Sequence, residues 1–206
     1  MSIEIKKPFG PSVAKIIIPP EIISSMNDYV EVTIKDKIKS DDLNYGYNLA
    51  GNVQQEFRLG LDFMKEYKWG EFLGKSCQKW LLEGHNITIK KFEIISSWIV
   101  RQFKNEYNPI HYHSGDISGV GYLKVPTNMG NTSQKEKKNE NGNLVLIHGN
   151  KQFLSNSILN IKPKVGDFYF FPNYLMHTVY PFTDTDEERR SVSFNATLDS
   201  GVTELL

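Results

Sequence analysis

The chain has 206 residues, 39% of them hydrophobic and 12% aromatic, which is enough apolar side-chain surface to build one sizeable core. Lysine plus arginine and aspartate plus glutamate both number 24, so the formal net charge is zero. These totals argue against wholesale disorder and against a strong overall field that would attract nucleic acid or an anionic membrane.

The first part of the chain is predicted to be rich in helices. A short β-like run at residues 15–18 is stopped by Pro19-Pro20, and a helix is expected over residues 21–32. Residues 35–49 are charged and are expected to be a loop, with Asp41-Asp42 as a possible cap. Apolar side chains recur at helical spacing over residues 53–67 and 69–82.

The second of these two helices is expected to end at Gly84. We therefore predict that residues 1–86 form a helix-rich support layer, which packs against one face of a sheet formed by the later residues.

From residue 87 the hydrophobic period shortens toward two, which favours strands. Strands are expected at residues 88–91, 94–103, 117–125, 144–148, 153–158, 168–171, 177–180 and 191–198. Many short strands in succession are typical of a sandwich or jelly roll rather than of βαβ units. We therefore predict one domain over residues 1–206, mainly β, with a jelly-roll core at residues 87–200 behind the helical layer. The polar residues 127–143 are expected to be a solvated loop, with a lid over the site as the alternative.

Two histidines stand two residues apart in the stretch Asn108-Pro-Ile-His111-Tyr-His113-Ser-Gly-Asp116. Successive side chains in a strand point to opposite faces, so His111 and His113 are expected to project together. A third histidine from a distant strand would complete three contacts on one side of a divalent metal and leave the opposite positions open.

A basic and polar strand follows near the end of the chain. Arg189 and Ser191 share one strand face, whereas Arg190 shares the other with apolar residues. An arginine fork with a hydroxyl beside an open metal site would clamp a carboxylate. The competing interpretation is an ordinary ion pair between Arg189 and the acidic residues 186–188.

The ordered set of motifs resembles a known enzyme family. The motifs, in order, are His111-x-His113, Tyr122-Leu123, Pro163-x-x-Gly166-Asp167, His177 and Arg189-x-Ser191. Over about residues 95–198 this order resembles the iron(II)/2-oxoglutarate-dependent oxygenases, in particular a small prolyl-hydroxylase-like branch of bacteria and phages. The resemblance implies a double-stranded β-helix, or jelly roll, with Fe(II) at one mouth and 2-oxoglutarate as co-substrate. It also implies decarboxylation of 2-oxoglutarate to succinate, coupled to hydroxylation of a second substrate.

The resemblance also assigns roles to individual residues. His177 occupies the place of the distal metal ligand, and Arg189 that of the arginine that binds the distal carboxylate of 2-oxoglutarate, with Ser191 beside it. Tyr122 matches a position whose phenol can reach the same carboxylate, although plain packing explains a strand tyrosine equally well. No catalytic residue separate from the metal site is implied.

The second metal ligand departs from the commonest family pattern, in which a carboxylate stands two residues after the first histidine. Here that residue is His113, and the nearest carboxylate is Asp116. A three-histidine site of His111, His113 and His177 is one possibility. The other uses Asp116 in place of His113, because Gly115 could bend the chain enough to return Asp116 to the same face. Strand parity favours His113.

The predicted function is an iron(II)- and 2-oxoglutarate-dependent dioxygenase that acts on an unidentified small molecule or peptide. The alternatives are a three-histidine cupin-like metalloenzyme that does not use 2-oxoglutarate, and a non-catalytic jelly-roll binding module. A cupin-like metalloenzyme would not need the pair Arg189 and Ser191, and a binding module would have no reason to keep two histidines in phase with a distant third. The zero net charge argues against duplex nucleic acid as a partner, and the oligomeric state is not predicted.

The expected compartment is the cytoplasm. A lone cysteine, Cys77, excludes an internal disulfide framework and fits a reducing environment. The first eight residues contain no long apolar segment of the kind found in secretory signals, and no run approaches 18 apolar residues, so no membrane span is expected.

Overall fold

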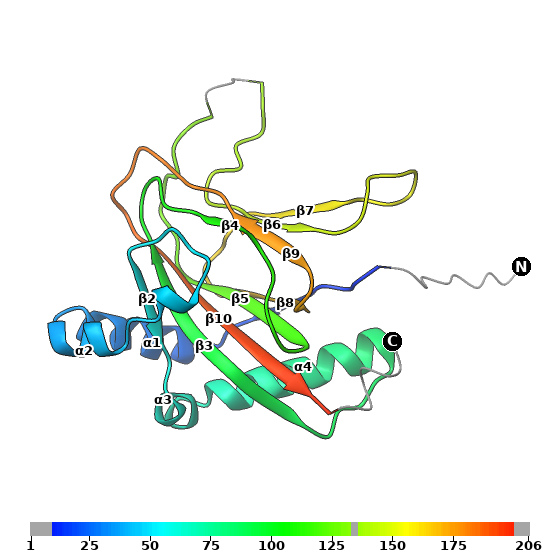
Figure 1. Cartoon of the computed structure of the whole chain (residues 1–206), viewed down its shortest axis with the longest axis horizontal. Helices are drawn as coiled ribbons and strands as arrows, with labels where there is room; N and C mark the ends of the chain where they lie inside the picture. The colour runs from blue at the N-terminus through cyan, green and yellow to red at the C-terminus, as the bar shows by residue number, and fades with distance from the viewer. Residues whose placement is uncertain (1–9, 133–135, 200–206) are drawn as a thin grey trace, which may run out of the picture.

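The computed structural model describes residues 10–132 and 136–199, and its centre is a pair of antiparallel sheets (Figure 1). The larger sheet contains, in spatial order, β1 (Ala14–Ile17), β8 (Asp167–Pro172), β5 (Ile117–Lys124), β10 (Arg189–Leu198), β3 (Phe92–Gln102) and β2 (Gln55–Arg58). The smaller sheet contains β4 (Asn108–His111), β9 (Met176–Val179), β6 (Leu144–Ile147) and β7 (Ile158–Ile161). From β4 to β10 the chain passes back and forth between the two sheets. This winding confirms the predicted jelly roll.

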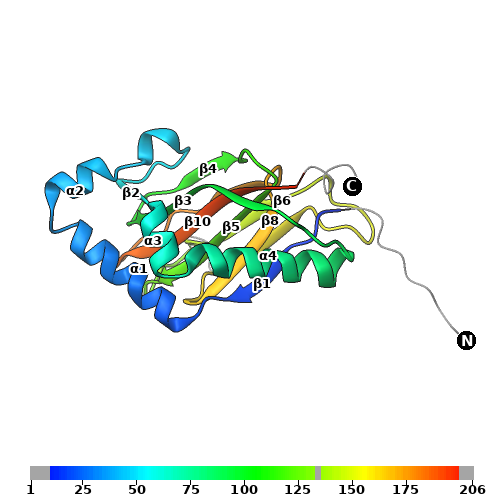
Figure 2. The same cartoon turned by 90° about the horizontal axis from the view of Figure 1, so that it is seen from below.

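Helices cover the face of the larger sheet that points away from the smaller one (Figure 2). The helical elements of the described residues are α1 (Pro20–Thr33), α2 (Lys37–Asp42), η1 (Gly46–Asn48), α3 (Leu61–Glu66) and α4 (Trp69–His85), and of these α1, α3 and α4 lie across that face. None of the helices in the described residues has the length and hydropathy that a bilayer span requires.

The main core lies between these helices and the larger sheet. The buried side chains of α1 and α4 recur every three or four residues, so each helix presents one apolar stripe. Trp69 of α4 packs edge-on against Phe168 of β8, with ring centroids 5.5 Å apart. Burying one such large apolar side chain stabilises the fold by about 1.5–3 kcal/mol. This packing holds the larger sheet rigid, and its opposite face is the one that carries the polar site.

Several predictions for the first part of the chain are wrong at the level of single elements. Residues 53–67 are not one helix. They form the edge strand β2 and the short helix α3, because Phe57 and its neighbours pair with β3 instead. Residues 35–49 contain α2 and η1 rather than only loop. Asp36 caps α2 by accepting a hydrogen bond from the Lys39 amide at 3.1 Å, so Asp41-Asp42 lie in the last turn and are not the cap.

The end of α4 and two predicted strands also differ. The helix continues past Gly84 to His85 and stops at Asn86, which adopts a left-handed conformation with φ 58°. Residues 88–91 are not a strand, and Asp199 accepts hydrogen bonds from the amides of Lys90 and Lys91 there. Residues 153–157 form a turn, and the strand β7 begins at Ile158.

The polar segment 127–143 leads from β5 to β6, and its residues 133–135 lie outside the described residues. The N-terminal residues 1–8, in which no secretory signal is expected, also lie outside them. The described parts of segment 127–143 are tied to the segment that precedes β10. Thr127 donates its backbone amide to Glu187 Oε2 at 2.7 Å, and the Gly142 amide donates to Pro181 O at 3.2 Å. Whether this loop acts as a lid stays a prediction.

Candidate metal centre

Three histidine rings converge between the two sheets. His111 of β4 stands directly opposite His177 of β9 in the antiparallel register, and His113 follows two residues after the end of β4. The ring centroids of His111 and His177 are 4.2 Å apart, and those of His113 and His177 are 5.0 Å apart. One ring nitrogen of each histidine lies within 4.8 Å of the others, so all three can contact a single metal ion.

His113 lies beyond the regular strand, and Asn173, from the turn after β8, holds its backbone by two hydrogen bonds. Its amide donates to Asn173 O at 3.1 Å, and Asn173 Nδ2 donates to His113 O at 3.0 Å. The predicted common face of His111 and His113 is therefore present, although strand pairing fixes only His111.

The protonation of two of the rings is set by the backbone. His111 Nδ1 lies 2.7 Å from Pro109 O and His177 Nδ1 lies 2.9 Å from Leu175 O. A carbonyl oxygen only accepts, so Nδ1 carries the proton in both rings and Nε2 keeps the lone pair that a metal needs. Burial lowers the pKa of all three histidines, to about 3 for His113 and about 4 for His177, and neighbouring imidazoles add to the lowering for these two. All three rings are therefore neutral near pH 7.

Asp116 lies outside this group. Its Oδ2 accepts a hydrogen bond from the Leu198 amide at 2.8 Å, and its own amide donates to Ala196 O at 2.9 Å. Gly115 has φ 96°, and a Cβ there would stand 2.7 Å from Ala196 O, so the turn fits only glycine. The glycine bend that the sequence suggested therefore directs Asp116 toward the end of β10 and away from the histidines.

A buried arginine shares a cavity with the histidines. The residues that line this cavity include Trp98, Gln102, Asn108, His111, His113, His177, Arg189 and Ser191. Arg189 is only 1% exposed, and its Nη1 donates to Gln102 Oε1 at 3.1 Å and to Ser191 Oγ at 3.5 Å. The guanidinium carbon lies 5.0 Å from the centre of the Tyr122 ring.

Buried polar atoms of Arg189 and of Tyr122, whose ring lies against the guanidinium, have no hydrogen-bond partner among the described residues. These atoms are Arg189 Nε, Arg189 Nη2 and the Tyr122 hydroxyl. Burial lowers the pKa of Arg189 and raises that of Tyr122 to about 12, so the first is a cation and the second a neutral donor. Unsatisfied buried donors are costly, and a carboxylate that accepted from both groups would satisfy them. The donor set therefore fits an anion.

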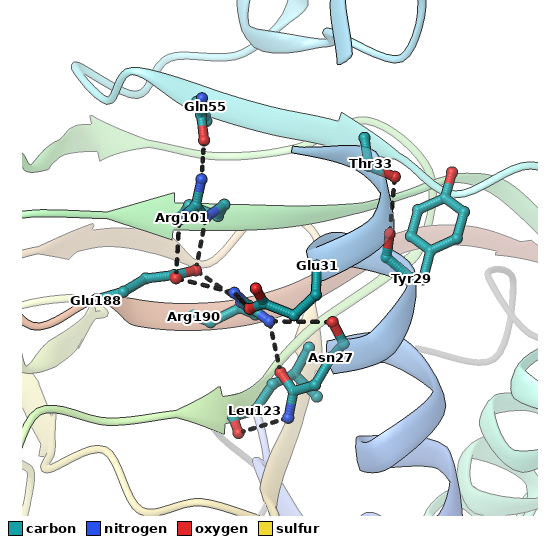
Figure 3. Close-up of polar contacts among 9 residues, drawn as sticks. All are labelled: Asn27, Tyr29, Glu31, Thr33, Gln55, Arg101, Leu123, Glu188 and Arg190. Atoms are coloured by element: carbon teal, nitrogen blue, oxygen red, sulfur yellow. Dashed lines mark hydrogen bonds and ion pairs between the residues drawn. The ribbon is translucent and has the colours of Figure 1, made fainter. Parts of the chain in front are cut away.

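Arg190 points the other way, as strand alternation predicts. It forms ion pairs with Glu188 at 2.6 Å and with Glu31 at 2.8 Å on the helical side of the sheet (Figure 3). Glu188 pairs with Arg190 and Arg101, and the neighbouring acids Asp186 and Glu187 contact Lys104 and Thr127. The competing prediction of an ion pair for Arg189 therefore finds no support in the described residues.

Neither Gln102 nor Trp98 belongs to the motifs that predicted the site. Both line the cavity, and the Trp98 ring centroid lies 5.6 Å from that of His113. The available signal was parity, because Trp98, Val100 and Gln102 alternate along one predicted strand. His85 and His148, which no sequence motif places in the site, line a different cavity.

Comparison with known proteins adds a family and a fold. Residues 96–195 match a family model described as putative 2OG-Fe(II) oxygenase, and no curated protein sequence matches the chain. A collagen prolyl hydroxylase of Paramecium bursaria Chlorella virus-1, solved with 2-oxoglutarate, superposes with a TM-score of 0.55 at 16% identity, covering 89% of this chain and 94% of that one. A prolyl-4-hydroxylase of Pseudomonas putida gives 0.56 at 12% identity, covering 89% and 91%.

A prolyl hydroxylase of Trichoplax adhaerens, solved with a peptide fragment of hypoxia inducible factor, gives a TM-score of 0.55 at 12% identity, covering 94% of this chain and 86% of that one. At these identities the solved structures show a shared fold. The matched segment 96–195 contains all three histidines and both Arg189 and Ser191.

Proposed function

We propose that residues 96–195, which match the 2OG-Fe(II) oxygenase family model, are the core of an iron(II)/2-oxoglutarate-dependent oxygenase, and we assign each task to residues of this chain. His111, His113 and His177 hold the iron, and Arg189 with Ser191 and Tyr122 binds the distal carboxylate of 2-oxoglutarate. When bound, the iron and 2-oxoglutarate would use dioxygen for oxidative decarboxylation, in which one oxygen atom enters succinate as carbon dioxide leaves and the other is transferred to a second substrate. The supporting observation is one cavity lined by three neutral imidazoles and by a buried guanidinium that has no carboxylate partner among the described residues.

The chain's own groups prepare this site before either ligand arrives. The carbonyls of Pro109 and Leu175 orient two imidazoles, so their Nε2 atoms need no rearrangement to bind the metal. Apolar side chains of Val120, Leu144 and Phe171 form part of the cavity wall and keep water from the histidines. No separate acid or base is needed, because the protein's part is to bind, orient and exclude water.

Three neutral histidines leave the charge of a divalent metal uncompensated by protein, unlike a site with two histidines and one carboxylate. An anionic co-substrate therefore contributes more to metal binding here. Because 2-oxoglutarate has two carboxylates, one can neutralise charge at the metal while the other meets Arg189. We expect metal and 2-oxoglutarate to strengthen each other's binding.

The second substrate is proposed to be a peptide or a small molecule rather than duplex nucleic acid, since the net charge is zero. We also propose that residues 1–86 act as a support layer for a catalytic core at residues 87–200, because the α-helices in the described residues all precede residue 87. A cytoplasmic location is proposed on the single cysteine Cys77, which is free and buried.

The proposed function is tested by loading the protein with Fe(II) without oxygen, adding 2-oxoglutarate and then air, and measuring succinate. Slow succinate formation that requires iron and is lost in Arg189→Ala is expected. Metal binding without any binding or turnover of 2-oxoglutarate would favour the cupin-like alternative. Failure to bind metal at all would favour the non-catalytic binding module.

A further inference from the structure

A buried carboxylate bridges two arginines directly behind the proposed 2-oxoglutarate clamp. Glu188 Oε1 accepts from Arg101 Nε at 2.8 Å and from Arg190 Nε at 2.6 Å, and Glu188 Oε2 accepts from Nη2 of the same arginines at 3.0 and 2.9 Å (Figure 3). The Glu188 side chain is only 5% exposed. One carboxylate therefore joins two guanidinium forks, and four charge-assisted hydrogen bonds fix its position.

The two arginines that Glu188 joins are direct cross-strand neighbours. In the antiparallel register of β10 and β3, Arg190 stands opposite Arg101. Like charges in directly opposed positions destabilise a strand pair, and burial strengthens the repulsion. Glu188 replaces this repulsion with attraction, so it holds β10 and β3 together at this position.

The next pair in the same register is the proposed clamp. Arg189 stands opposite Gln102, on the other face of the sheet. Gln102 Nε2 donates to Glu106 O at 2.6 Å and to Tyr180 O at 3.4 Å, which leaves Gln102 Oε1 to accept from Arg189 Nη1. A shift in register or a separation of the strands at Arg190 and Arg101 would move the Arg189 guanidinium relative to Gln102 and to the cavity.

The charges of this cluster are also unequal. Three guanidiniums, of Arg101, Arg189 and Arg190, face two carboxylates, of Glu188 and Glu31. Glu31 reaches Arg190 from α1 and is about half exposed, so Glu188 is the buried counter-ion. Although burial raises the pKa of Glu188, hydrogen bonds from Arg190 and Arg101 hold it below its usual value, and the group is ionised at neutral pH. Of these three guanidiniums, Arg189 is the one that has no carboxylate partner among the described residues.

We propose that Glu188 is a positioning residue for the co-substrate: by joining Arg101 to Arg190 it fixes the strand register that presents Arg189 to the distal carboxylate. This inference rests on the proposed function, because it assumes that Arg189 binds that carboxylate. Glu188 itself lies on the opposite face of the sheet and does not touch the co-substrate. Its effect should therefore be confined to ligands that reach Arg189.

The test uses Glu188→Gln, which keeps the shape and removes the charge, beside Glu31→Gln as the matched control. Glu31 pairs with the same Arg190 but does not contact Arg101, so its loss leaves the bridge between the strands. The full chain is loaded with Mn(II), and calorimetry gives the Kd for Mn(II), for 2-oxoglutarate and for 2-oxobutyrate, which has no distal carboxylate. We expect Glu188→Gln to raise the Kd for 2-oxoglutarate about tenfold or more.

The same variant should leave the Kd for Mn(II) and for 2-oxobutyrate within twofold of wild type, and Glu31→Gln should leave all three values within twofold. With iron, the KM for 2-oxoglutarate should rise while kcat at saturation is kept. A merely structural role would instead weaken both oxo acids and Mn(II) together, in step with a lower Tm.

Wild-type 2-oxoglutarate affinity in Glu188→Gln, with affinity lost in Arg189→Met, would overturn the inference and leave the proposed function standing. No 2-oxoglutarate binding by the Mn(II)-loaded wild type would overturn the proposed function instead. If Glu188→Gln does not fold, Glu188→Asp replaces it, because the shorter acid keeps the charge but cannot reach both forks. The same selective loss for 2-oxoglutarate is then expected, and equal losses for both oxo acids would refute the inference.

Discussion

Replacing Arg189 with methionine should stabilise the ligand-free protein and strongly weaken its affinity for 2-oxoglutarate. The guanidinium is 1% exposed, and two of its nitrogens have no partner among the described residues. Burial of this guanidinium therefore carries a desolvation free energy that no anion offsets in the ligand-free protein. Methionine has a similar length and fills the same space with an apolar chain. If Arg189 served only to stabilise the fold, its replacement would lower the free energy of unfolding instead of raising it.

The expected change in the free energy of unfolding is the difference between two opposing contributions. Removing an uncompensated buried charge is expected to gain about 2–4 kcal/mol, and leaving Gln102 Oε1 without its donor costs about 1–2 kcal/mol. The net gain of about 0–3 kcal/mol corresponds to a rise in Tm of up to about 12 °C for a chain of this length. For the ligand, an unpaired carboxylate in the same cavity costs about 2–5 kcal/mol, which weakens 2-oxoglutarate binding by about 30-fold to 3,000-fold.

The assay is thermal unfolding of the metal-free and Mn(II)-loaded protein over a series of 2-oxoglutarate concentrations. Without 2-oxoglutarate, the Tm of wild type should be lower than that of Arg189→Met. As 2-oxoglutarate is added, the Tm of wild type should rise and that of Arg189→Met should stay constant. Arg190→Met is the control, because it breaks an existing ion-pair network and should lower Tm without removing the response to 2-oxoglutarate completely. A lower starting Tm in Arg189→Met, together with an intact response, would refute the reasoning.

Three further predictions concern other residues. Burial, aided by Glu106, raises the pKa of Glu56 to about 7 from 4.5, so this group's contribution to stability is present below about pH 4.5 and is lost as the pH rises through 7. Glu56→Gln should remove this loss, making the variant more stable than wild type by about 3 kcal/mol at pH 8 in urea unfolding, and equal pH profiles would contradict it. His113→Ala should weaken Mn(II) binding at least about 100-fold in a metal titration, whereas Asp116→Asn should change it less than about threefold, and the reverse order would reinstate Asp116 as the ligand. Tyr122→Phe removes one buried donor and should raise the Kd for 2-oxoglutarate about tenfold with unchanged Mn(II) affinity, while an unchanged Kd would make Tyr122 a packing residue.

Properties that depend on strand alternation could be predicted from the sequence. The sidedness of Arg189 and Arg190 is one, because neighbouring residues of a strand must face opposite ways. The jelly-roll class is another, since many short strands with turns between them leave few other arrangements. The convergence of His111, His113 and His177 was expected from the motif order, and the antiparallel pairing of β4 with β9 places the first and last of these rings opposite each other.

Other features depended on contacts between residues distant in the chain. Residues 53–67 have helical spacing, yet Phe57 joins a strand because β3 offers an unpaired edge. Gly115 permits several backbone directions, and only the Leu198 amide at the end of β10 selects the one that carries Asp116 away from the histidines. Local sequence sets periodicity and side-chain direction, because both follow from backbone geometry. The partner of each buried polar group is set by tertiary structure, because it depends on which distant strand arrives beside it.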